Sequence, residues 1–174
     1  MKKILAVIMI LCVGVTGFFS GCIQKGEGTL ILQITDDPGD LNITEALVTM
    51  SEVKVHYAGF DENDTFGEWI TIVNESQTFD LISLQNATEL FGEANLSAGW
   101  YTQIRLSVDE ALVTIDGVQY DLEISPSKVK LIKPWKITDG ETLVLTLDFD
   151  VQKSVHETGN GKYIMEPTIK IIQD

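Results

Sequence analysis

The sequence has little cysteine, histidine or proline. Its 174 residues include only two cysteines, two histidines and four prolines. Cys12 lies inside an apolar run and Cys22 follows that run, so we expect no disulfide and no thiol chemistry in the folded domain. A serine hydrolase needs a nucleophile beside a histidine base, and no Gly-x-Ser-x-Gly motif occurs. These absences argue against nucleophilic catalysis.

Positive charge is also scarce. Lysine and arginine total 12 against 26 aspartate and glutamate residues, which gives a formal net charge of -14. Proteins that bind nucleic acids need clustered basic side chains to replace the counterions of the phosphates. We therefore expect no nucleic-acid partner, and we expect any membrane attachment to rest on something other than a basic patch.

The N-terminus does contain a clear targeting pattern. Lys2 and Lys3 precede an uncharged apolar run that ends in Phe19-Ser20-Gly21-Cys22. A short basic start, an apolar middle and a small residue before cysteine are typical of a lipoprotein signal peptide that is cut before Cys22. Residues 1–21 are then the signal peptide, and lipid on Cys22 attaches the protein to the extracytoplasmic face of the cell membrane. An uncleaved transmembrane anchor and ordinary secretion remain as alternatives.

The rest of the chain has the length of one domain. Residues 22–28 form a linker that reaches only about 20 Å when extended, so the domain is expected close to its membrane. Residues 29–174 follow as a single domain, which must be stabilised by one apolar core because it has no disulfide. Without Lys2 and Lys3, ten basic residues remain against 26 acids, for a net charge of -16.

Apolar residues alternate with polar ones through most of this domain, which indicates β-strands. A phase change near Ser51-Glu52 predicts a bulge, and Asp116-Gly117 predicts a type I′ hairpin turn. The one predicted helix covers Leu81–Phe91, with Asp80 as its N-cap. Strands are expected at residues 29–35, 46–57, 69–73, 100–108, 111–115, 118–124, 129–132, 135–137, 141–150 and 162–172. The pattern predicts an all-β fold, an antiparallel β-sandwich with one short accessory helix.

Several segments resemble a known family over nearly all of the mature domain. They are Gly28-Thr29-Leu30 through Thr35-Asp36-Asp37-Pro38-Gly39-Asp40, Val53-Lys54-Val55-His56, Thr78-Phe79-Asp80-Leu81, Gly99-Trp100-Tyr101-Thr102-Gln103-Ile104-Arg105-Leu106, Leu147-Asp148-Phe149-Asp150 and Gly161-Lys162-Tyr163. Together they resemble domain of unknown function 4382, found in archaeal and bacterial surface lipoproteins. The resemblance implies a transthyretin-like, or prealbumin-like, sandwich and a place at the cell surface, and it implies no activity.

Oxygen-rich loops provide candidate calcium sites. One candidate is the turn with Asp36, Asp37 and Asp40; the other is the loop with Asp61 and Asn63, whose spacing matches the start of an EF-hand without its later glycine and glutamate. The alternative is ordinary turn chemistry and a solvated loop. His56 and His156 could hold a transition metal with an aspartate if their strands meet.

The phase of each predicted strand indicates the surroundings of several other side chains. Asp148 and Asp150 share one face of a strand at a spacing usable for glycoside hydrolysis, but a solvated acidic face is the preferred interpretation. Trp100 is predicted in the core and Trp135 exposed in a loop, where a ring could stack on a sugar. Arg105 is predicted to pair with a neighbouring acid, with a ligand carboxylate as the alternative.

Asparagine in the pattern Asn-x-Ser/Thr is an acceptor for N-glycosylation. The chain has five such sites, all between residues 42 and 97, and each is expected in or near a loop or helix end. If they are used, glycans shield that half of the surface. The five are Asn42, Asn63, Asn74, Asn86 and Asn95.

These observations predict a membrane-tethered, non-catalytic binding or assembly module. It would contact an unidentified cell-surface ligand or protein. The alternative is a metal-dependent surface binding protein or an accessory hydrolase, with calcium as the candidate cofactor. Convergence of acids or histidines in one pocket would favour this second class.

Overall fold

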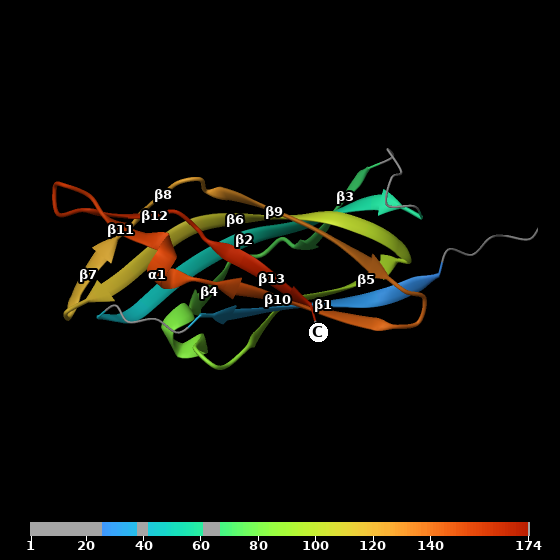
Figure 1. Ribbon diagram of the computed structural model, residues 1–174, viewed down its shortest axis with the longest axis horizontal. Coiled ribbons are helices and arrows are strands. Elements are labelled where there is room, and N and C mark those ends of the chain that lie inside the picture. Colours follow the sequence, from blue (N-terminus) through green and yellow to red (C-terminus); the bar gives the residue numbers. More distant parts are fainter. Residues whose placement is uncertain (1–25, 38–41, 61–66, 174) are drawn as a thin grey trace, which may run out of the picture.

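The computed structural model describes residues 26–37, 42–60 and 67–173. Two layers of strands run along the long axis of the molecule and face each other, as Figure 1 shows. The predicted all-β sandwich is therefore confirmed. Because both layers alternate apolar and polar residues, each contributes one apolar face to a shared core and leaves the other face outside.

The first layer has the strand order β13-β10-β1-β5. β1 pairs with β5 in antiparallel fashion but with β10 in parallel, from Thr29 opposite Thr142 to Asp36 opposite Phe149. A parallel pair needs a long crossover, and here the whole second layer lies between the two strands in sequence. The bounds are β1 Glu27–Asp36, β5 Glu89–Ser97, β10 Thr142–Phe149 and β13 Ile169–Gln173.

The second layer, called sheet B below, is built on two 17-residue antiparallel strands, β2 and β6. β3 and β4 pair with the outer edge of β2, and β7 and β9 pair with the outer edge of β6. The bounds are β2 Ile43–Gly59, β3 Glu68–Val73, β4 Gln77–Asp80, β6 Gly99–Ile115, β7 Val118–Asp121 and β9 Lys128–Ile137.

Smaller elements complete one end of the sandwich. A three-stranded sheet has the order β11-β12-β8, in which β12 and β8 are parallel. The predicted strand over residues 162–172 is thus divided into β12 and β13, which belong to different sheets. The bounds are β8 Glu123–Ile124, α1 Val151–Ser154, β11 Val155–Glu157 and β12 Tyr163–Met165.

The predicted helix over Leu81–Phe91 is wrong beyond its first turn. A 3-10 turn, η1, covers Leu81–Leu84, and β5 begins at Glu89. Leu81 and Leu84 are buried as the helical spacing predicts, but Phe91 is buried through strand alternation, because β5 pairs with β1. Asp80 does not cap the turn, since its Oδ1 accepts the backbone N–H of Ala46 at 3.1 Å.

Two local predictions in sheet B are confirmed. The register of β2 against β6 shifts between Met50 and Glu52, so Ser51 lies at the predicted bulge. The Asp116-Gly117 turn joins β6 to β7, with Ile115 opposite Val118 and φ angles of 50° and 79° at the two turn residues. Both angles are positive, as a type I′ turn requires.

The predicted phase of the two tryptophans is wrong. Trp100 is only half-buried, whereas Tyr101 is fully buried and stacks on Trp135 at 5.8 Å between ring centroids and 14° between planes. Trp135, predicted to be exposed, is 2% exposed. A register shift between Tyr101 and Gln103 in the pairing of β6 with β9 explains the error, because such an irregularity reverses the alternation beyond it.

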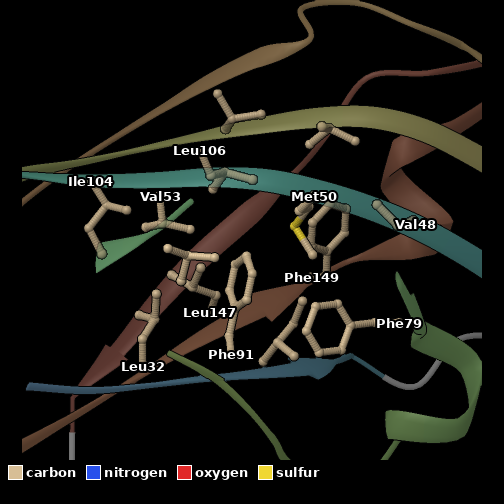
Figure 2. Packing of buried hydrophobic residues seen from close by; sticks show 14 of the residues in the cluster. Leu32, Val48, Met50, Val53, Phe79, Phe91, Ile104, Leu106, Leu147 and Phe149 are labelled. Carbon is tan, nitrogen blue, oxygen red and sulfur yellow. The ribbon is translucent and has the colours of Figure 1, made fainter. Parts of the chain in front are cut away.

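The core fills the space between the two layers. In Figure 2, Leu147 and Phe149 of β10 and Leu32 of β1 point toward Met50 and Val53 of β2. Phe79 and Phe91 meet edge to face, with ring centroids 5.2 Å apart. This continuous core is what a disulfide-free domain of this size needs.

Candidate functional site

Different segments of the chain lie at the two ends of the sandwich (Figure 1). The described chain enters at Gly26, whose carbonyl accepts the N–H of Ala98 at 2.7 Å, beside the Asp139-Gly140 turn. The Asp116-Gly117 turn and the loop between β11 and β12 lie at the opposite end of the long axis, as Figure 1 shows. We call the latter the distal end.

A cleft opens at the distal end. Its volume is about 480 Å³, and it lies between β7 and β8 on one side and β12 with its preceding loop on the other. The elements come together because β8 pairs with β12 in parallel, Glu123 opposite Ile164. The lining residues are Gln119, Tyr120, Asp121, Glu123, Thr158, Gly161, Lys162, Tyr163 and Ile164.

Two tyrosines form the aromatic part of this cleft. The rings of Tyr120 and Tyr163 are 4.7 Å apart between centroids and inclined at 58°, and both side chains are half-buried. Partial burial, with the nearby Glu157 carboxylate, raises the pKa of Tyr163, so its hydroxyl remains a hydrogen-bond donor at neutral pH. Sequence reasoning missed this pair, because 43 residues separate its members and neither belongs to a recognisable motif.

The loop on the other side of the cleft is held by its own hydrogen bonds. The backbone N–H and the hydroxyl of Thr158 both donate to the carbonyl of Lys162, at 2.7 and 2.9 Å. Gly161, with φ of 68°, donates its N–H to the Thr158 carbonyl at 3.1 Å. The cleft therefore has a preformed wall, which lowers the cost of ordering on binding.

Asp36 is buried and serves a structural purpose. It is 2% exposed; its Oδ1 accepts the N–H of Val151 at 3.0 Å, and its Oδ2 accepts the side-chain amide of Gln85 at 3.1 Å. Burial raises its pKa to about 6, with a further rise from the Asp150 and Asp148 charges, although the two hydrogen bonds oppose the shift. Asp36 thus joins the end of β1 to the start of α1 and to Gln85 at the end of η1.

Asp148 and Asp150 lie beside it, and their predicted solvated face is wrong. The Asp148 side chain is 13% exposed and Asp150 is 4% exposed, because the chain turns into α1 immediately after β10. Burial would raise the pKa of Asp150, but hydrogen bonds from the ammonium and backbone N–H of Lys153 outweigh it, so the pKa is lowered. Burial raises the pKa of Asp148, although Lys170 partly compensates.

These carboxylates are engaged within the protein. Asp150 caps α1, and Lys170 lies 3.7 Å from Asp37 and 4.0 Å from Asp148. Within residues 26–37, 42–60 and 67–173, no group of three or more histidine, cysteine, aspartate or glutamate side chains is arranged to hold a metal ion. Asp40, Asp61 and Asn63 lie outside these residues, so the calcium loops stay predictions.

The two histidines have different neighbours. Nδ1 of His56 is 2.8 Å from the Thr102 hydroxyl, and its ring lies 4.9 Å from that of Trp69. Nε2 of His156 lies 3.9 Å from Glu166. β2, which bears His56, pairs with β3, β4 and β6, whereas β11, which bears His156, pairs with β12. The strands do not pair, so the condition set for a shared metal site is not met.

Arg105 does not have the predicted acidic partner among the described residues. Its guanidinium carbon lies 4.1 Å from the ring centroid of Trp69, two strands away across β2. A cation over an indole face is stabilised by the ring quadrupole. The sequence could not predict this contact, since 36 residues separate the two side chains.

Comparison of the sequence with models of known protein families identifies the family of this chain. The model described as Domain of unknown function (DUF4382) matches residues 27–167. The chain belongs to this family. The match covers β1 to β12 and the distal cleft, and it confirms the resemblance noted from the sequence. Neither the curated proteins nor the solved structures gave a match.

Four of the five sequons lie in the described part of this DUF4382 domain. Their asparagines are exposed: Asn42, Asn74 and Asn86 lie outside strands, whereas Asn95 lies within β5 and accepts the Thr29 hydroxyl at 3.1 Å. Asn63 lies outside the described residues. β3, η1 and β5, near three of these sites, follow the sandwich edge opposite β9 and β13. Use of the sequons stays a prediction.

Cys22 and residues 1–21, the predicted signal peptide, also lie outside the described residues. Among the residues that are described, no helix is long and apolar enough to cross a membrane.

Proposed function

We propose that this DUF4382 domain is a non-catalytic binding module, held at the extracytoplasmic face of the membrane by lipid on Cys22, and that it receives its ligand in the distal cleft. The Tyr120–Tyr163 pair, set in a cleft of about 480 Å³ at the end opposite the chain entry, carries this proposal. Aromatic faces flanked by a few polar groups are typical of ligand sites.

The position of the cleft supports an outward-facing role. Only three residues separate Cys22 from Gly26, a reach of roughly 14 Å when extended. With Cys22 in the membrane, the Gly26 end of the sandwich lies near the lipid and the distal cleft faces away from it. A ligand on another cell or in the surrounding medium then reaches the cleft first.

The lining favours a polar ligand with one flat apolar side. Gln119, Asp121 and Glu123 offer hydrogen-bonding groups beside the tyrosine rings, a combination that suits a sugar residue. The only aliphatic hydroxyl in the lining, that of Thr158, donates to the Lys162 carbonyl, and the described lining supplies no histidine base. The described lining therefore lacks the hydroxyl–histidine pair of a serine hydrolase, and the test below also looks for cleavage of the sugar by its carboxylates.

Neutral oligosaccharides provide a direct test. Cello-, manno- and chito-oligosaccharides are titrated into the isotopically labelled domain, and amide chemical shifts are recorded. We expect one series to shift residues of β7 and β12, and we expect Tyr163→Ala to weaken that binding at least tenfold. Trp100→Ala, which removes a half-buried ring outside the cleft, is the control. Shifts that survive in Tyr163→Ala, or release of cleaved sugar, would overturn the proposal, as would the absence of binding in all three series.

A further inference from the structure

Half of the chain's scarce positive charge lies on three adjacent strands. Of the 12 lysines and arginines, one is on β2, one on β6 and four on β9. In a chain with 26 acids this concentration is unexpected, and the sequence analysis did not predict it. The six are Lys54, Arg105, Lys128, Lys130, Lys133 and Lys136.

Three of them lie side by side on the outer face of sheet B. Lys54 is directly opposite Arg105 in the β2–β6 register, and Arg105 is directly opposite Lys130 in the β6–β9 register. Their inward-facing neighbours along the same strands, Val55, Ile104 and Leu106 among them, are buried in the core. The three cations therefore form a row across the strands, spaced at about 4.8 Å per strand. We call Lys54, Arg105 and Lys130 the basic row.

The basic row is poorly neutralised by the protein itself. Lys54 pairs with Glu52 at 2.6 Å, but Arg105 lies over the Trp69 ring, and Lys130 has no ion pair among the described residues. Lys128 and Lys136, which face the same side of β9, likewise have none there. Like charges directly opposite on neighbouring strands are destabilising. The row therefore keeps positive charge that a ligand with negative charges can neutralise.

A second row, of rings and apolar side chains, runs beside the first. His56 is opposite Trp69 on one side and Gln103 on the other, and Gln103 is opposite Ile132. Ile132 is 69% exposed, whereas the rings of Trp69 and His56 are half-buried. Figure 1 shows β3, β2, β6 and β9 forming the upper layer, with the first layer on its other side. A line of cations beside half-buried rings and an exposed isoleucine thus lies on the outer face of sheet B.

We propose that this face of sheet B binds an acidic polysaccharide, laid across β2, β6 and β9 so that successive carboxylates meet the basic row while sugar faces contact the adjoining rings. The proposal concerns a different surface from the distal cleft and stands independently of it.

Two other polyanions fit the face less well. A partner polypeptide that adds as a strand needs unpaired backbone groups, which sheet B offers only at its edge strands and not at β2 or β6, so an added strand would lie beside the basic row and not across it. An anionic bilayer is an extended surface, which the net charge of -14 repels. A thin linear chain contacts only the basic row, and acids farther away than about 8 Å are largely screened at physiological salt.

Oligogalacturonate and its methyl ester form a matched pair of probes, because esterification removes the charge and keeps the sugar. We expect the folded domain to bind the acid form, with a change in Trp69 fluorescence, and to bind the ester at least tenfold more weakly. Arg105→Gln and Lys130→Gln are each expected to lower the affinity at least fivefold. Lys153→Gln removes one charge from α1, outside sheet B, and is expected to leave the affinity unchanged.

Poly-glutamate tests an acidic polypeptide as the ligand, and phosphatidylglycerol vesicles test an anionic membrane. We expect both to bind more weakly than oligogalacturonate. Tighter binding of either one, equal binding of acid and ester, or no binding of oligogalacturonate would overturn the proposal. An equal loss in Lys153→Gln would also overturn it, because the attraction would then depend on overall charge instead of on the basic row. Thermal unfolding of each variant confirms that the fold is retained.

Discussion

Oδ1 of Asp36 accepts a hydrogen bond of 3.0 Å from the backbone N–H of Val151, 115 residues farther along the chain. This bond connects the end of β1 to the first turn of α1, inside a region where Asp36 is 2% exposed. A buried carboxyl in this position links the stability of the fold to pH. It also shows that Asp36 has a structural role, because it holds β1 against α1.

Asp36 should make the folded protein less stable as the pH rises. The folded-state pKa of Asp36 is raised to about 6 from the ordinary 3.8, so its contribution to stability is fully present below pH 4 and is lost as pH rises through 6. Asp36→Asn keeps an acceptor for Val151 and removes the charge. At pH 8 we expect this variant to be more stable than the wild type by up to about 3 kcal/mol, at roughly 1.36 kcal/mol per pKa unit.

Urea unfolding at pH 4 and pH 8 measures this effect. Asp109→Asn, at an exposed position of β6, is the control and is expected to leave the pH dependence unchanged. If Asp36→Asn retained the wild-type loss of stability between pH 4 and pH 6, another group would have to be its cause.

Trp135 on β9 and Trp100 on β6 differ in how deeply they are buried, so their substitutions should differ in cost. Trp135 is 2% exposed and stacks on Tyr101, whereas Trp100 is half-buried on the outer side of β6. We expect Trp135→Ala to lower the free energy of unfolding by about 3–5 kcal/mol. Trp100→Ala should cost less than about 1 kcal/mol. Chemical denaturation of both variants checks the difference, and the reverse order would restore the sequence-based assignment.

The β6–β7 turn depends on the backbone of Gly117. Its φ is 79°, and an added Cβ would meet no atom within 4 Å, so Gly117→Ala introduces backbone strain without a steric clash. We expect a loss of about 1–2 kcal/mol. Gly159→Ala, where φ is not in this region and space is also open, is the matched control and should be nearly neutral. Thermal unfolding of the two variants measures the contrast.

The proposed lipid anchor is tested at one cysteine. Cys22→Ser removes the proposed lipid site, and we expect the folded domain to move from the membrane fraction to the soluble fraction or the medium. Cys12→Ser changes a cysteine within the apolar run and should leave the protein in the membrane. Fractionation with an antibody against the domain measures both. A Cys22→Ser protein that stayed in the membrane would favour the uncleaved anchor.

Patterns of local origin were predicted well. Strand alternation identified the sandwich, and two adjacent residues, Asp116 and Gly117, sufficed for the hairpin turn because its φ angles depend only on them. The Leu81–Phe91 helix was wrong because its apolar spacing fits a 3-10 turn followed by a strand equally well. Only the pairing of β5 with β1 distinguishes the two.

The chemistry of single side chains depended on contacts between distant segments. Sequence alone determined the all-β fold and the net negative charge, and it predicts a targeting signal, because each follows from composition or short-range periodicity. It could not show that Asp36 is buried against Val151, that Tyr120 meets Tyr163, or that Lys54, Arg105 and Lys130 share one row. Strand register creates these contacts, and register is set by the packing of the whole sandwich, since a slip of one residue turns every side chain to the other face.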